Sequence, residues 1–163
     1  MTLFVGIDPG TSGAIALLDE CGRLLSVVPM PGFGTEPAAM DVASLLEAMG
    51  RPDELYVVLE EPFANNMASA ISQLNQGIGY GVLLGVVGTM GLRHERIKPS
   101  TWKRTLGLPM SRELTYAQKK RNSRQFATRF WPDQAHNWSK TTQDGLAEAA
   151  LIAEAGRRRF NVE

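Results

Sequence analysis

The chain has 163 residues, of which 44% are hydrophobic and 21% charged, and this ordinary composition predicts a single domain over residues 1–163. It contains no apolar run of about 18 residues and no basic N-terminal leader, so we expect neither a membrane span nor a secretory signal. Its single cysteine, Cys21, can form neither an internal disulfide nor a thiolate metal site. We therefore expect a reducing, cytoplasmic setting, and oxygen or histidine ligands for any metal.

The formal net charge is zero, but the charges are segregated along the chain. Residues 1–92 carry 2 basic and 10 acidic side chains, residues 93–131 carry 11 basic and 2 acidic, and residues 132–163 carry 4 basic and 5 acidic. A basic stretch is often only a solvated helix face. However, 11 positive charges between residues 93 and 131 favour a polyanionic partner.

The first predicted elements are three short apolar segments at residues 3–7, 14–18 and 24–28. They are separated by turn-forming residues, which predicts three strands in an antiparallel meander. A loop is expected over residues 29–37, then a helix over residues 38–49.

The rest of the chain begins with a fourth predicted strand, followed by helices and one more strand. The predicted elements are a strand at 55–59, a weakly polar helix at 69–92, an edge strand at 95–98, a short helix from Pro99, a basic helix at 113–130 and an amphipathic helix at 143–158. The order β-β-β-α-β-α-β followed by helices predicts an α/β fold with a five-stranded sheet of mixed direction and flanking helices.

Two of the predicted core strands end on carboxylates, Asp8 and Glu60. An ionised carboxylate at the end of a buried strand is costly, and two on neighbouring strands repel each other. Asp144 and Glu148 lie four residues apart on the last helix, so they share a face where like charges are also unfavourable. A divalent cation such as Mg²⁺, which prefers oxygen ligands, would relieve these costs, and two such ions can support phosphodiester hydrolysis.

Each of these carboxylates also has a simpler explanation. Asp8 can stabilise the turn that follows it, Asp144 can cap the last helix, and Glu148 can be a solvated helix residue. The joint pattern is harder to explain in this way, and it favours a metal site.

Three acidic motifs occur in the order found in a known nuclease family. The sequences GIDPGT (6–11), LEEPF (59–63) and DGLAEA (144–149) resemble those of the RuvC Holliday-junction resolvases. The segments PSTWKR (99–104) and KKR (119–121) are similar to phage and chloroplast members of that group. The first motif is shared with actin-like kinases, so the resemblance depends on all three motifs together.

The resemblance implies an RNase H-like fold, dependence on Mg²⁺ or Mn²⁺, and a homodimer that makes paired nicks in branched DNA such as a four-way junction, in recombination and repair. It implies that Asp8, Glu60, Asp144 and Glu148 are the catalytic metal ligands, with Glu60 rather than Glu61 at the strand end. The bacterial prototype ends with two aspartates three residues apart. Asp144 and Glu148 are four residues apart, as in phage-like members. Whether both of them bind the metal directly therefore stays open.

Basic and aromatic residues complete the predicted DNA-binding surface. Phe63 follows Pro62 at the mouth of the predicted site, and the resemblance implies that it inserts beside bases; packing against a helix is the alternative. Lys103 and Lys120 match basic family residues near the scissile phosphates. The other candidates for phosphate contact are Lys98, Arg104, Arg112, Lys119, Arg121 and Arg124, and we expect about half of all eight basic residues to reach DNA.

The predicted helix at 69–92 is rich in glycine, with Gly77, Gly81 and Gly85 at a spacing of four. Glycine costs about 1 kcal/mol in a helix interior, so its repeated use indicates close approach of another backbone. Either the sheet packs there, or residues 72–92 pair with a second copy of the chain, as the resemblance implies. The aromatic side chains expected to be packing anchors are Trp102, Trp131 and Trp138.

Three other functions fit parts of the sequence. A nucleotide-binding or kinase-like protein shares the turn after Asp8, but it needs a second similar domain, for which 163 residues are too few. A non-catalytic nucleic-acid-binding module would leave the carboxylates unexplained. A related nuclease for RNA–DNA hybrids, flaps or forks is not distinguished from a junction resolvase by sequence.

Overall fold

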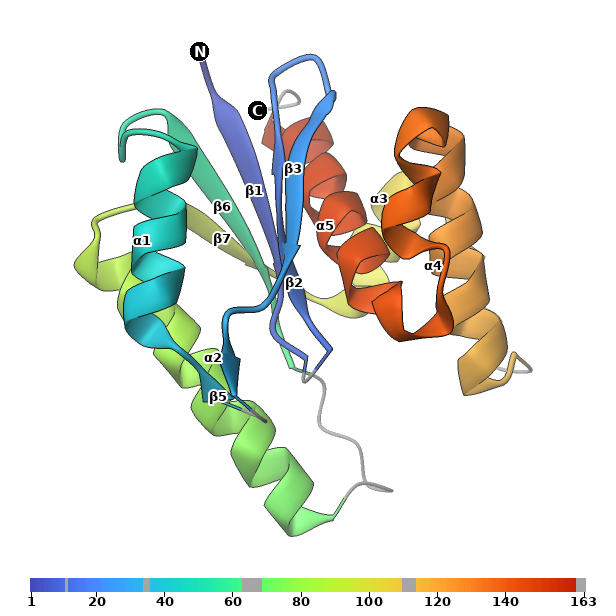
Figure 1. Cartoon of the computed structure of the whole chain (residues 1–163), viewed down its shortest axis with the longest axis horizontal. Helices are drawn as coiled ribbons and strands as arrows, with labels where there is room; N and C mark the ends of the chain where they lie inside the picture. Colours follow the sequence, from blue (N-terminus) through green and yellow to red (C-terminus); the bar gives the residue numbers. More distant parts are fainter. Residues whose placement is uncertain (11, 34–35, 63–68, 110–113, 161–163) are drawn as a thin grey trace.

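The computed structural model of the chain describes residues 1–10, 12–33, 36–62, 69–109 and 114–160 (Figure 1). Its elements are β1 (Leu3–Asp8), β2 (Ala14–Leu18), β3 (Leu24–Pro29), β4 (Gly32–Phe33), β5 (Glu36–Pro37), α1 (Ala39–Met49), β6 (Leu55–Glu60), α2 (Ala70–Thr89), β7 (Arg93–Ile97), α3 (Pro99–Leu106), α4 (Tyr116–Phe130), two 3-10 helices (Pro132–Trp138 and Thr141–Gln143) and α5 (Asp144–Phe160).

The main sheet has five strands in the order β3-β2-β1-β6-β7. Strands β1, β2 and β3 pair antiparallel, and β6 and β7 run parallel to β1. The predicted meander and the predicted five-stranded sheet of mixed direction are both confirmed. Because β1 and β6 are parallel neighbours, their carboxyl ends lie at the same edge of the sheet.

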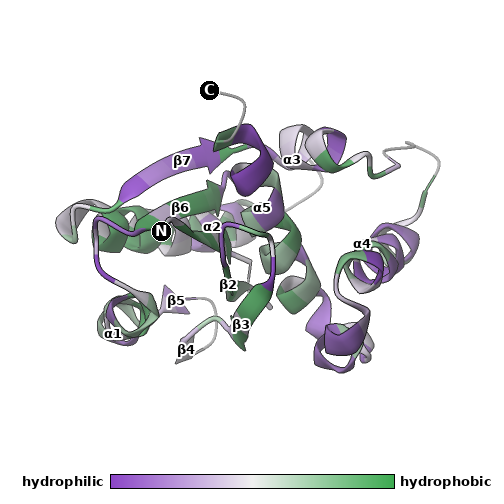
Figure 2. Cartoon of the chain, turned by 90° about the horizontal axis from the view of Figure 1, so that it is seen from above, coloured by the Kyte–Doolittle hydropathy of each residue, from purple (hydrophilic) through white to green (hydrophobic). Residues whose placement is uncertain are grey.

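Helices cover both faces of this sheet (Figure 1). Helices α1 and α2 lie on one face, and α3, α4 and α5 lie on the other. Alternate residues of β1 therefore enter different cores: Val5 and Ile7 belong to the cluster on the α1–α2 side, and Phe4 to the cluster on the α5 side. Figure 2 shows the consequence: hydrophobic residues run through the sheet and α5, whereas α4 and β7 are largely hydrophilic.

Helix α5 packs unusually close to the sheet because glycines face it. A Cβ added at Gly6 of β1 would lie 2.1 Å from the carbonyl oxygen of Ala149, and one at Gly156 would lie 2.1 Å from Val58 Cγ2. Real Cβ atoms do not approach that closely, so only glycine fits at either position. This tight packing fixes where the N-terminal residues of α5 lie relative to the ends of β1 and β6.

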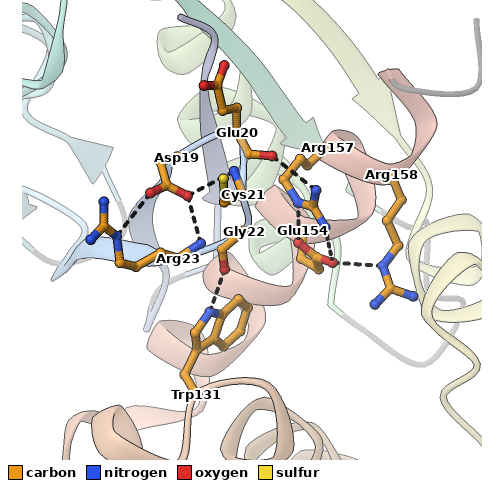
Figure 3. Close-up of polar contacts among 9 residues, drawn as sticks. All are labelled: Asp19, Glu20, Cys21, Gly22, Arg23, Trp131, Glu154, Arg157 and Arg158. Carbon is orange, nitrogen blue, oxygen red and sulfur yellow. Dashed lines mark hydrogen bonds and ion pairs between the residues drawn. The ribbon is translucent and has the colours of Figure 1, made fainter.

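A buried carboxylate outside the predicted set anchors the other end of α5 (Figure 3). Glu154 is 2% exposed and receives hydrogen bonds from Arg157 (2.7 and 2.9 Å) and Arg158 (2.7 Å). Arg157 also donates to the carbonyl of Glu20 in the β2–β3 turn at 3.2 Å. These contacts tie the C-terminal half of α5 to the turn at the far end of the sheet.

Several expected boundaries were wrong. The loop expected at 29–37 contains the two-stranded β4–β5 sheet, and the edge strand spans Arg93–Ile97 rather than 95–98.

The sheet does not pack against Gly77, Gly81 or Gly85, because no described atom lies within 4 Å of a Cβ added at any of them. Among the described residues, no helix is both long and apolar enough to cross a membrane.

Candidate active site

The first two carboxylates of the predicted set lie at the shared edge of β1 and β6. Ile7 pairs with Leu59 in the parallel register, so Asp8 and Glu60 end adjacent strands. Asp8 is 6% exposed and accepts a hydrogen bond from the Gly10 backbone amide at 3.0 Å. Glu60 is partly buried, and its Oε1 accepts a hydrogen bond from the indole nitrogen of Trp102 on α3 at 2.9 Å. The sheet therefore brings these two acids together as the sequence predicts.

The electrostatic field at this edge opposes ionisation. Burial, and next the charge of Glu148, raise the pKa of Asp8 to about 6, against the opposing influence of Lys120. Burial, and next the charge of Asp8, raise the pKa of Glu60 to about 8, while the Trp102 hydrogen bond lowers it. Asp8, Glu60 and Glu148 thus feel one another's charge, although they come from three different elements.

The N-terminal turns of α5 supply the other two predicted acids. Asp144 is the first residue of α5, and Glu148, one turn later, is 6% exposed. A Cβ added at Gly145 would lie 1.8 Å from the carbonyl oxygen of Ser12, so the start of α5 lies directly against the β1–β2 turn. A cavity of about 150 Å³ opens here, lined among others by Asp8, Ser12, Lys120, Thr141, Thr142 and Asp144.

Helix α4 places two cations and a hydroxyl against these acids. Lys120 forms an ion pair with Glu148, and Arg124 forms one with Asp144. Ser123, which is 1% exposed, donates a hydrogen bond to Glu148 Oε1 at 3.0 Å. The two acids of α5 therefore lie near Asp8 but are paired with side chains of α4.

The donor set fits a divalent cation that prefers oxygen ligands. Four carboxylates come from three elements, and the raised pKa values of Asp8 and Glu60 reflect a cost that a bound cation would relieve. The arrangement is nevertheless not a closed cage. Among the described residues, no three His, Cys, Asp or Glu side chains are grouped so that they could hold one ion.

Comparisons with known proteins give a match at the level of structure. A scan against protein-family models finds no match, and no curated protein matches. The structure is similar to that of T. thermophilus RuvC in complex with a Holliday junction substrate, with a TM-score of 0.67 and 17% sequence identity over 97% of this chain and 96% of that one. A second T. thermophilus RuvC structure gives a TM-score of 0.62, also at 17% identity, over 98% of this chain and 97% of that one.

The chain has the RuvC fold. With it, the expected RNase H-like architecture of a mixed five-stranded sheet and flanking helices is confirmed. Both comparison chains are covered almost completely, so the RuvC fold accounts for this chain from β1 to α5.

On this RuvC fold, the predicted DNA-binding residues fall into two groups. Lys103 of α3 is partly buried over the Trp102 ring at 5.0 Å, and its charge lowers the pKa of both Asp8 and Glu60, so it lies near the acidic edge. Lys120 lines the cavity. The residues that lie exposed on the surface are Lys98, Arg104, Lys119 and Arg121. The predictions for Phe63 and Arg112 fall outside the described residues.

Three contacts at the site were missed by the sequence analysis. They are the Trp102–Glu60 hydrogen bond, the Ser123–Glu148 hydrogen bond and the Arg124–Asp144 ion pair. Trp102 is fully buried, so its expected packing role is confirmed, and the bond to Glu60 adds to it. The spacing of Lys120, Ser123 and Arg124 by three and four residues was the available signal, because it puts them on one helix face.

Proposed function

We propose that this chain is a metal-dependent endonuclease that cuts branched DNA, with the four-way junction as its substrate, in recombination and repair. The observation that carries the proposal is the acidic edge of the sheet, where burial and the neighbouring carboxylates, Glu148 among them, raise the pKa of both Asp8 and Glu60 within a RuvC fold. A structural role does not require acids from three elements to lie within reach of one another's charge at one edge of the sheet, whereas an oxygen-ligand metal site does.

In this proposal the four acids hold Mg²⁺ or Mn²⁺. The bound metal would supply an activated water and stabilise the leaving oxygen of the phosphodiester bond. Asp8 and Glu60 contribute ligands fixed by the strands, and Trp102 orients Glu60 through its indole hydrogen bond. Lys103 and Lys120 lie beside the acids and neutralise the scissile phosphate.

Charge distribution supports a nucleic-acid substrate. The 11 basic residues between residues 93 and 131 span β7, α3 and α4, and these elements flank the acidic edge. Phosphate contacts of this kind bind nucleic acid without reading sequence. Selectivity for branched DNA is supported by the similarity to T. thermophilus RuvC, a structure that contains a Holliday junction substrate. Base stacking by Phe63 belongs to the same proposal.

A homodimer formed through α2 is the assembly we propose. Ile71, Leu74 and Ile78 are 73, 62 and 46% exposed, and Gly81 and Gly85 continue their stripe with open space above them. Large apolar side chains followed by bare glycine backbone suit close contact with an identical helix across a two-fold axis. Two chains joined in this way would present two acidic edges to opposed strands of one junction.

The dimer is tested by Gly81→Leu, which fills open space in the single chain and obstructs a helix that approaches closely. Gln76→Leu, at an exposed position on the opposite side of α2, is the matched control. By analytical ultracentrifugation we expect the unmodified protein and Gln76→Leu to be dimers and Gly81→Leu to be a monomer with an unchanged circular dichroism spectrum. A Gly81→Leu dimer would contradict the interface.

The activity is tested by incubating the protein with a labelled synthetic four-way junction in Mg²⁺. We expect nicking that disappears in EDTA and falls by more than about a hundredfold in Asp8→Asn. Asp133→Asn, which removes an exposed carboxylate of a 3-10 helix, is the matched control and should nick normally. Tight binding of the junction without cutting in either Mg²⁺ or Mn²⁺ would make the chain a binding module instead.

A further inference from the structure

Helix α4 holds both acids of α5 through contacts that are largely shielded from water. The side chains of Arg124 and Asp144 are each 16% exposed, and those of Lys120 and Glu148 are 21% and 8% exposed. Screening by solvent is weak at such positions, so each ion pair is stronger than one on the open surface. We call Lys120 and Arg124 the counterion pair.

The counterion pair and a divalent cation need the same oxygens. Arg124 occupies Oδ1 of Asp144, Lys120 occupies Oε2 of Glu148, and Ser123 occupies the remaining oxygen, Oε1 of Glu148. A cation that binds these acids must either displace the two positive side chains or lie beside them and be repelled.

The attachment of α4 allows such an exchange without disrupting a core. Its C-terminal end is fixed by Trp131, which is 5% exposed and donates to the carbonyl of Gly22 at 2.9 Å (Figure 3), and by the Trp138 bond to Thr128 at 3.0 Å. By contrast, residues 117–122 are all exposed or partly buried. Residues 117–122 therefore bury little of their own surface, and the Lys120–Glu148 ion pair is the contact that holds them to α5.

We propose that Lys120 and Arg124 substitute for the charge of the metal ion in the metal-free protein, where they bind Glu148 and Asp144 and weaken divalent-cation binding by direct competition. When the cation binds the two acids, the two basic side chains turn to the phosphate of the substrate. The proposal rests on the proposed metal site, and it adds a device that couples cation binding to the availability of two DNA-facing charges. Arg124 then has a role that the resemblance does not assign to it.

The test is the affinity of the full chain for Mn²⁺ by isothermal titration, without DNA, in Arg124→Gln and Lys120→Gln. We expect each variant to bind Mn²⁺ about tenfold more tightly than the unmodified protein, because a repelling charge has been removed from the ligand. Arg129→Gln, which removes a charge on the exposed side of the same helix, should bind as the unmodified protein does. Arg124→Lys, which restores a charge, should return the affinity toward the original value.

A thermal measurement checks folding and gives a second readout. In EDTA, Arg124→Gln should melt at a lower temperature, because Asp144 loses its partner, and Mn²⁺ should raise its melting temperature by more than that of the unmodified protein. Unchanged or weaker Mn²⁺ affinity in both glutamine variants would overturn the counterion role. In that case, junction cutting by the unmodified protein would still support the proposed nuclease activity. Failure of every variant to bind Mn²⁺ would overturn both.

Discussion

Replacing Glu60 by glutamine should stabilise the metal-free protein, and the effect should depend on pH. The pKa of Glu60 is raised from 4.5 to about 8, so the stability that its protonated form contributes is complete below pH 4.5 and is lost as the pH rises through about 8. Each pKa unit corresponds to about 1.36 kcal/mol, so ionisation costs the folded state up to about 4 kcal/mol near pH 8. Glutamine keeps an oxygen for the Trp102 hydrogen bond and removes the charge.

Local relaxation around the carboxylate reduces this cost, and we expect Glu60→Gln to raise the free energy of unfolding by about 2–4 kcal/mol at pH 8. For a chain of this size that corresponds to an increase in melting temperature of roughly 4–16 °C. The assay is thermal unfolding by circular dichroism from pH 5 to pH 9 in EDTA. The gap between the two proteins should widen with pH. Parallel curves, or a glutamine variant that is less stable at pH 8, would refute the electrostatic account of the site.

Three further substitutions test the packing and hydrogen bonds around the site. Trp102→Phe should lower the free energy of unfolding by about 1–3 kcal/mol above pH 8, because ionised Glu60 loses its hydrogen-bond donor, and by less at pH 5. Equal losses at the two pH values would contradict this. Gly6→Ala should cost more than about 3 kcal/mol in urea unfolding, because its Cβ would meet the Ala149 carbonyl at 2.1 Å; a loss below 1 kcal/mol would show that α5 can shift. Glu154→Gln should cost about 3 kcal/mol, because it leaves two arginines without their buried partner, and an unchanged melting temperature would exclude this anchoring role.

The parts of the fold that could be predicted are those in which a local pattern determines the outcome. A short apolar run closed by an acid, as in residues 4–8 and 56–60, favours a buried strand with its carboxylate at the sheet edge, and both strands were found there. Helical spacing placed Asp144 and Glu148 on one face of α5. The pairs of residues in β4 and β5 are too short to carry a period, and that small sheet was missed.

The contacts that could not be predicted are those set by how helices pack on each other. Trp102 is 42 positions from Glu60, and Arg124 is 20 positions from Asp144. Which face of α3 or α4 meets the acids depends on the angle at which each helix lies on α5, and no local pattern encodes that angle. The basic residues of α4 were therefore predicted to bind DNA, whereas two of them also neutralise acids of the chain itself.

The central claim is that the acidic edge cuts branched DNA. The most direct measurement uses a four-way junction labelled in turn on each of its four strands, beside a linear duplex of the same sequence and a flap, all in Mg²⁺. We predict nicks at symmetric positions in two opposed strands of the junction, with 5′-phosphate ends, and none in the duplex or in any substrate incubated with Asp8→Asn. Equal cutting of the linear duplex, or cutting that persists in Asp8→Asn, would contradict the account.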